Sequence, residues 1–65
     1  MRTEEIYEVY AARAEKGEPV KNVGAVRASS LREAAVFAHK MYDEWRWREM
    51  FVVARRALIQ VIRPD

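Results

Sequence analysis

One stretch of this sequence has its apolar residues spaced as on one face of an α-helix, and it lies between stretches that favour β-strands. This order permits only a few folds. Ser30-Leu31-Arg32-Glu33 matches the capping box, in which the Ser hydroxyl accepts a hydrogen bond from the third helical amide and the Glu returns to the cap amide. The spacing of the apolar side chains that follow is that of one face of an α-helix. They are Leu31, Ala34, Ala35, Ala38, Met41, Tyr42 and Trp45. The sequence therefore predicts one amphipathic helix, with Trp45 at the end of its stripe.

Strand-like stretches lie on both sides of this helix. Residues 5–13 alternate and are rich in Ile, Tyr and Val, and residues 20–28 resume the same character after a turn-type segment that contains Gly17. Gly24 interrupts the second stretch, which predicts a bulge or a close approach by another group. In residues 50–63, most odd-numbered and most even-numbered positions are apolar, so both faces of a strand there would be apolar. This stretch predicts a long final strand. Its paired arginines, Arg55 and Arg56, suggest a bulge there.

The order strand, strand, helix, strand predicts a small α+β domain of ββαβ type, a single domain over residues 1–65. The first two strands are joined as a hairpin. A right-handed crossover through the helix then makes the third strand parallel to the second, so that it fits beside the first. We therefore expect a three-stranded antiparallel sheet of order 2-1-3, with the helix packed on one face.

One helix covers only one face of such a sheet, which leaves the other face and an edge strand open. Apolar patches and edge strands of this kind usually mark association sites. The chain is therefore predicted to form a homo-oligomer, a dimer or higher. The residues that we expect to mediate self-association are Ile6, Tyr10, Val52, Ala54 and Leu58.

Length and composition favour the same prediction. A chain of 65 residues buries only about 60% of the surface that it exposes when unfolded. It contains no cysteine, so neither a disulfide nor a thiolate metal site can supplement the core. No apolar run approaches the length of a membrane span, and the charged first residues lack the pattern of a signal peptide. A cytoplasmic protein without a membrane partner is expected.

Charge is unevenly distributed along the chain. Residues 1–18 carry three basic and five acidic groups, whereas residues 45–63 carry five arginines and one glutamate. The simplest interpretation is that these segments lie side by side and offset each other. The alternative function is a small basic nucleic-acid-binding domain, in which the arginines, Trp47, Phe51 and Tyr10 form a face for stacked bases. No RRM-type aromatic signature or GXXG loop accompanies them, so a nucleic-acid partner is disfavoured.

The sequence contains no pattern typical of catalysis. His39 is the only histidine, which excludes an ordinary zinc site, and the two glycines are too far apart for a phosphate-binding loop. We therefore expect no catalytic, metal-binding or cofactor-binding residues, no cofactor, and no activity of the chain alone.

The segment EWRWREM, residues 44–50, holds both tryptophans. Trp45 continues the helix stripe and is predicted to lie in the core. Trp47 does not fit the helical spacing and falls in the connection between the helix and the final strand. There it either makes a cation–π contact within the chain or serves as an anchor residue for a partner. The predicted partner-binding residues are Trp47, Arg46 and Arg48, with Arg55 and Arg56 as exposed or rim residues.

Several short segments, taken in order, resemble one family. They are Tyr7-Glu8-Val9-Tyr10, Lys16-Gly17, Val23-Gly24-Ala25-Val26-Arg27-Ala28, Ala34, Ala35, Ala38, Tyr42 and Phe51-Val52-Val53. Over roughly residues 5–60, the chain is similar to the phenylacetic acid degradation protein B (PaaB) family, the B subunit of the multicomponent phenylacetyl-CoA epoxidase. The resemblance implies a non-catalytic dimeric bridge in aromatic catabolism. Its implied partners are a di-iron catalytic oxygenase subunit and the helical companion of that subunit, which together transfer oxygen to the ring of an aryl-CoA.

Overall fold

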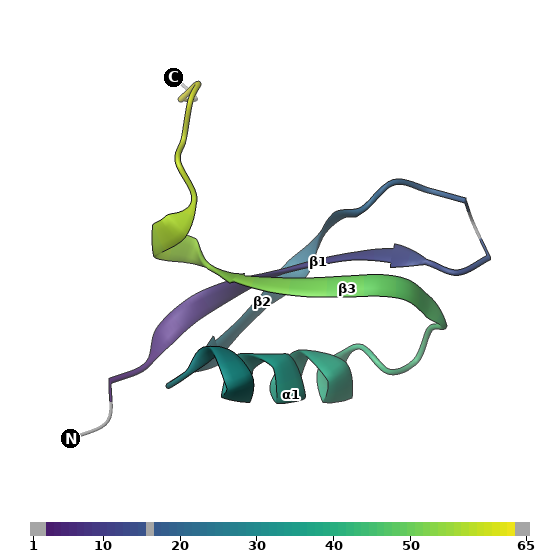
Figure 1. Cartoon of the computed structure of the whole chain (residues 1–65), viewed down its shortest axis with the longest axis horizontal. Helices are drawn as coiled ribbons and strands as arrows, with labels where there is room; N and C mark the ends of the chain where they lie inside the picture. Colours follow the sequence, from purple (N-terminus) through teal and green to yellow (C-terminus); the bar gives the residue numbers. More distant parts are fainter. Residues whose placement is uncertain (1–2, 16, 64–65) are drawn as a thin grey trace.

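The computed structural model describes residues 3–15 and 17–63, and its elements follow the predicted order. They are β1 (Glu5–Arg13), β2 (Lys21–Ala28), α1 (Leu31–Met41), β3 (Trp47–Ala54) and the short 3-10 helix η1 (Arg55–Ala57). The sheet has the order β2-β1-β3, with β1 antiparallel to both neighbours and α1 on one face (Figure 1). The predicted α+β fold and strand order are confirmed. Lys16, in the predicted turn, lies outside the described residues, as do residues 1–2 and 64–65 of the predicted domain.

The helix begins where the capping pattern predicts and ends earlier than the apolar stripe. Ser30 is extended, and its hydroxyl accepts a hydrogen bond from the Glu33 amide at 3.1 Å. The Glu33 carboxylate accepts from the Ser29 amide at 2.8 Å, one residue before the cap. After Met41, the amide of Tyr42 donates to the carbonyl of Ala38 at 3.1 Å, and the chain then turns. Trp45 is therefore outside the helix.

A small core lies between α1 and the sheet. Val9, at the centre of β1, is fully buried, and Ala34 and Ala38 let the helix backbone approach it closely. Tyr7, Val26 and Ala28 complete the buried cluster. Leu31 and Met41, which the stripe also predicts to be apolar contacts, lie at the flanks of the helix and are more than half exposed.

The strand register decides which side chains of β3 face the helix. Val52 lies opposite Val9, and Ala54 lies opposite Tyr7, so both point to the covered face and pack against the core. Val52 and Ala54 are predicted to mediate self-association together with Ile6 and Tyr10, but they lie on the opposite face of the sheet. Phe51 and Val53 are opposite Tyr10 and Glu8 instead, on the face away from α1. We call this the open face: Ile6, Glu8, Tyr10, Asn22, Ala25, Arg27, Phe51 and Val53.

The final strand ends at Ala54, nine residues before the predicted end at Arg63. In the register of β3, Ala54 already pairs with Tyr7, so β1 has almost no residues left to pair with a longer strand. The two arginines form η1 instead of a bulge. Irregular pairing occurs elsewhere, between Val9 and Tyr10 facing β2 and between Ala12 and Arg13 facing β3. The first of these lies beside Gly24, where the sequence predicts it.

Gly24 also receives the close approach that the sequence predicts. It has φ +156°, which disfavours a side chain, and a β-carbon there would overlap the hydroxyl oxygen of Tyr42. Because Tyr42 is the first residue after α1, this contact fixes the end of the helix over β2.

The acidic start and the basic end of the chain lie side by side, as predicted. Arg55 forms an ion pair with Glu8, and Nε of Arg56 lies 2.7 Å from Oε2 of Glu5, so η1 is held against β1. These hydrogen bonds stabilise the charged carboxylates. The pKa of Glu8 is lowered by the hydrogen bond from Arg55 and then by that from Asn22, and the pKa of Glu5 is lowered by Arg56 and then by the Tyr7 hydroxyl.

Acidification is therefore expected to destabilise the fold. Both carboxyls have folded pKa values below those of the unfolded chain, so their stabilisation is present above the ordinary Glu pKa and is lost as the pH falls through the folded values. We expect the urea midpoint to fall between about pH 6 and about pH 3. Glu8→Gln should reduce this pH dependence, because it removes one of the two carboxyls. An identical dependence in the wild type and Glu8→Gln would contradict the assignment.

No helix among residues 3–15 and 17–63 is long and apolar enough to cross a membrane.

Candidate partner-binding site

The five predicted partner-binding residues lie at the two ends of β3 and do not form one site. Arg46, Trp47 and Arg48 are at its start, and Arg55 and Arg56 follow its end. A strand of eight residues is roughly 26 Å long. Arg55 and Arg56 are engaged with Glu8 and Glu5 on β1. The candidate site is therefore built at the first end alone.

The two arginines beside Trp47 differ in how they are held. Nη1 of Arg46 is 3.5 Å from Oε1 of Glu15, and both side chains are largely in solvent. An ion pair of this kind contributes little to stability, so Arg46 is free to change partner. Arg48 donates from Nη2 to the carbonyl of Glu18 at 3.1 Å and contacts the Glu49 carboxylate at 3.2 Å. Arg48 thus ties β3 to the loop between β1 and β2.

Trp47 is a structural residue in this fold. Its side chain is half-buried, and its indole N–H donates to the carbonyl of Tyr42. That carbonyl lies at the end of α1, where helical carbonyls have no partner within the helix. The indole therefore closes the turn between α1 and β3.

The prediction that Trp45 lies in the core is wrong. Its side chain is 53% exposed in the turn after α1, and the guanidinium carbon of Arg13 lies 4.7 Å from the centroid of its ring. The cation–π contact considered for Trp47 is thus made by its neighbour. The reason is the early end of α1: once Tyr42 is docked on Gly24, the chain turns, and position 45 no longer faces the sheet.

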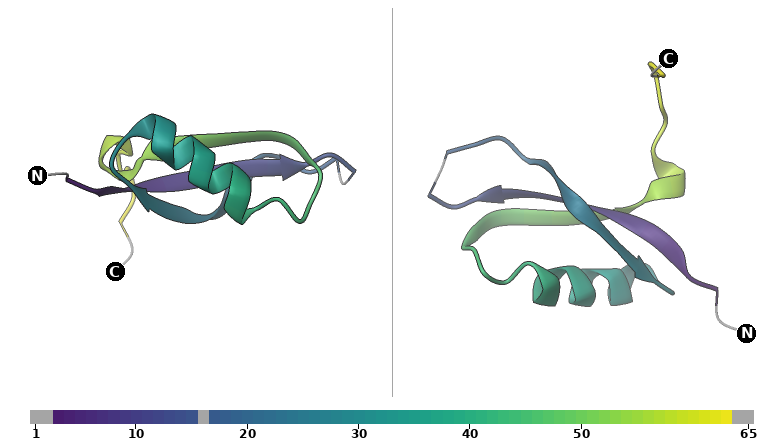
Figure 2. Two further views of the ribbon diagram at one scale, coloured as in Figure 1. Left: turned by 90° about the horizontal axis from the view of Figure 1, so that it is seen from below. Right: turned by 180° about the vertical axis from the view of Figure 1, so that it is seen from behind.

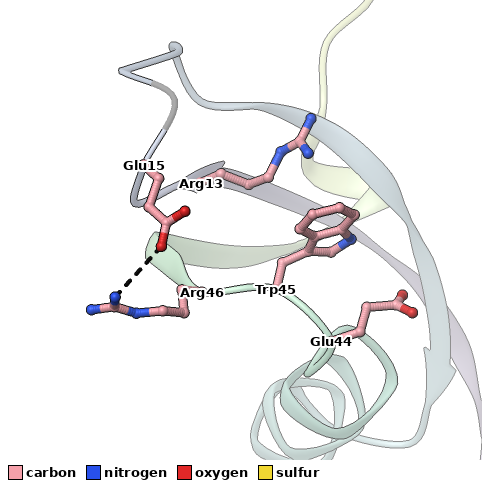
Figure 3. Close-up of a pocket in the computed structure, with 5 residues that line it drawn as sticks. All are labelled: Arg13, Glu15, Glu44, Trp45 and Arg46. Carbon is pink, nitrogen blue, oxygen red and sulfur yellow. Dashed lines mark ion pairs between the residues drawn. The ribbon is translucent and has the colours of Figure 1, made fainter.

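Trp45 stands at the centre of a shallow pocket of about 210 Å³ at this end of the molecule. Figure 3 shows its indole beneath the Arg13 guanidinium, with the ion pair of Arg46 and Glu15 on one side and Glu44 on the other. A second hollow of about 350 Å³ shares Arg13, Glu44 and Trp45 and continues along Trp47, Tyr42 and β2. We call Arg13, Glu44, Trp45 and Arg46 the Trp45 patch.

Two residues of the Trp45 patch, Arg13 and Trp45, hold each other in place within the isolated chain. Nε of Arg13 donates to Oε1 of Glu18 at 3.0 Å while its guanidinium lies over Trp45. The positions of both side chains are thereby restricted before any partner binds, which reduces the entropy that binding costs. Tryptophan and arginine are the types most enriched among residues that dominate binding energy. The arrangement suits a protein partner that offers an apolar side chain next to a carboxylate.

Neither Trp45 nor Arg13 is among the partner-binding residues that the sequence predicts. The exposure of Trp45 follows from the Tyr42–Gly24 contact between α1 and β2, and the position of Arg13 follows from the irregular pairing at the end of β1. The glycine inside β2 was the one available signal that another group approaches there.

Within the described part of the chain, no three His, Asp or Glu side chains are grouped so that they could hold a metal ion. His39 lies exposed on α1.

The fold is that of a small α+β domain, and the Trp45 patch is an exposed, shallow pocket at one end of it. Comparisons with protein-family models, with curated proteins and with solved structures found no match.

Proposed function

We propose that this protein is a non-catalytic bridging subunit of a multicomponent aromatic-CoA ring oxygenase of the phenylacetate degradation type. In this role it self-associates and docks a di-iron catalytic subunit and its helical companion, in the cytoplasm. The observation that carries the proposal is the open face, where Phe51 is 52% exposed beside Tyr10 in a sheet that has a helix on its other side only. An apolar sheet face of this kind is typical of a protein that works in an assembly.

The resemblance to the phenylacetic acid degradation protein B family supports the proposal, because residues that carry it contact one another in the fold. Residues that carry it meet in three dimensions: Tyr42 packs on Gly24, and Val9 contacts the helix alanines in the core. They form the frame that places α1 on the sheet. The Trp45 patch lies outside the resembling segments, on the surface, so we assign it to docking of the oxygenase subunits.

The ion pairs favour this function over the nucleic-acid alternative. Arg46, Arg48, Arg55 and Arg56 each lie within 4 Å of a glutamate of the same chain. Phosphate binding requires basic groups that release counterions from the nucleic acid. Here Glu8 and Glu5 neutralise Arg55 and Arg56, while the more exposed ion pairs of Arg46 and Arg48 offset those charges more weakly.

Co-purification tests the proposal. Tagged protein isolated from its native source is expected to bring down a di-iron oxygenase subunit and a helical companion in stoichiometric amounts, identified by mass spectrometry. The purified complex should oxygenate an aryl-CoA, and the isolated chain should not. Recovery of the chain without any oxygenase subunit, under conditions where the oxygenase is expressed, would reject the bridging role.

A further inference from the structure

Residues 58–63, which follow η1, form an apolar arm that makes almost no contact with its own domain. Ile59, Val61 and Ile62 are 86%, 88% and 86% exposed, and Leu58 is 45% exposed. Apolar side chains that are scattered singly on a surface need no explanation, but four within five residues do. The arm therefore has the composition of a buried segment and the exposure of a solvated one.

The arm extends on the same side of the sheet as the open face. Figures 1 and 2 show it leaving the end of β3 and projecting away from the sheet on the side opposite α1. Its origin is held in place, because Arg55 and Arg56 of η1 are paired with Glu8 and Glu5 on β1. The arm thus extends away from the sheet next to the open face and does not cover it.

The chain has more surface than a compact monomer of its mass. Its solvent-accessible surface is 5368 Å², whereas a folded monomer of 7.7 kDa is expected to expose about 4,300 Å². Its radius of gyration is 13.0 Å, compared with about 11 Å for a compact domain of this length. The excess of roughly 1,000 Å² is close to the share of about 800 Å² that one partner contributes to a standard interface.

The open face offers a surface that suits the arm. Tyr10 and Phe51 lie directly opposite each other, with Ile6 and Val53 on the same face. The carboxylate of Glu8, in the middle of this face, is paired with Arg55, and its side chain is only 13% exposed. A partner that covers the β1 and β3 part of the face therefore meets apolar side chains and a neutralised carboxylate, while Arg27, opposite Ile6 on the edge strand β2, stays in solvent.

We propose that the occupant of the open face is a second copy of this chain, and that the two copies exchange arms, residues 58–62 of each lying on the open face of the other. This inference rests on the self-association in the proposed function and specifies how it occurs. Two sheets stacked about a two-fold axis bring each arm to the partner, because arm and open face lie on the same side of one chain. Both complementary parts of the interface are present in a single sequence, so no other protein is required to cover the face.

Sedimentation equilibrium of the whole chain at about 1–200 µM tests the arm, a range in which a dimer with micromolar affinity is partly dissociated. The arm variant carries Ile59→Ser, Val61→Ser and Ile62→Ser, all at positions that contact little of the fold. We expect the wild type to be a dimer and the arm variant to dimerise roughly 100-fold more weakly. Gln60→Ser is the matched control within the arm and should dimerise like the wild type. Circular dichroism establishes that each variant is folded.

Mixing distinguishes exchange of arms from pairing of arm with arm. A face variant, Phe51→Glu, keeps its arm and loses its open face, while the arm variant keeps its face. Under exchange, the arm of the face variant still binds the face of the arm variant. The mixture should therefore form a heterodimer at least about tenfold tighter than either variant forms alone, the effect of recovering about 1.4 kcal/mol.

Each other outcome overturns a distinct statement. Wild-type affinity in the arm variant would overturn the role of the arm and leave the bridging function intact. No gain on mixing would overturn exchange. A monomeric wild type at the highest concentration would overturn both this inference and the self-association on which it rests, whereas docking of the oxygenase is decided separately by co-purification.

Discussion

Gly24→Ala is expected to leave the protein largely unfolded. The new β-carbon would overlap the Tyr42 hydroxyl, and the backbone at φ +156° disfavours any side chain. Overpacking and strain of this kind together cost about 3 kcal/mol. A single core of this size rarely provides more than about 3–5 kcal/mol. The free energy of unfolding, measured by urea denaturation followed by circular dichroism, should therefore fall close to zero.

Two further variants separate crowding from backbone strain. Tyr42→Phe removes the overlapping oxygen and leaves the ring carbon Cζ at 3.1 Å from the new β-carbon, so Gly24→Ala with Tyr42→Phe should regain part of the lost stability. Gly17→Ala introduces a side chain at φ +60° with no atom within 4 Å of it, so it reports strain alone, about 1 kcal/mol. Equal stability of Gly24→Ala and the wild type would show that Tyr42 does not hold α1 against β2.

Substitution of the two tryptophans is expected to affect different properties: Trp47→Ala the stability of the fold, and Trp45→Ala the binding of a partner. Trp47→Ala removes a half-buried ring and the donor to the Tyr42 carbonyl, so the free energy of unfolding should fall by about 2 kcal/mol. Trp45→Ala removes an exposed ring whose Arg13 contact contributes only about 0.5–1 kcal/mol, so the fold should persist. In calorimetric titrations with the oxygenase subunits that we propose as partners, Trp45→Ala should weaken binding roughly 30-fold, the effect of about 2 kcal/mol.

A conservative change completes this comparison. Trp45→Phe keeps an aromatic face for Arg13 and should retain more of the binding than Trp45→Ala. If Trp45→Ala binds the oxygenase subunits as tightly as the wild type, the docking surface lies elsewhere. If Trp45→Ala unfolds the chain, the ring belongs to the core in solution and the patch is not a docking site.

The sequence predicts the elements of this fold well where local and tertiary requirements agree. Residues 5–13 alternate, and β1 spans the same residues with Tyr7, Val9 and Ala11 buried on one face. The cap at Ser30 is a contact among neighbours in the chain, so it is visible in the sequence. The strand order follows from the hairpin and the handedness of the crossover, which do not depend on particular side chains.

The candidate site is the part that sequence reasoning places least well. In the sequence, the apolar period of a helix extends through Trp45. The contact of Tyr42 with Gly24 on β2 is what ends the helix at Met41. Residues 50–63 are apolar on both alternating sets, so the pattern does not say which set faces α1. Pairing with β1 decides it, and places Val52 and Ala54 under the helix and Phe51 in the open.

Local chemistry in the chain thus specifies one helix, three strands and their order, since capping, alternation and crossover handedness act between near neighbours or on the backbone. Contacts between distant segments specify the rest: where α1 stops, which face each β3 side chain occupies, and which tryptophan meets solvent. A hydrophobic pattern records that a residue can be buried, whereas its burial depends on whether another element reaches it. Trp45 meets the Arg13 guanidinium and is still 53% exposed, and Ile59, Val61 and Ile62 of the arm are almost fully exposed among the described residues.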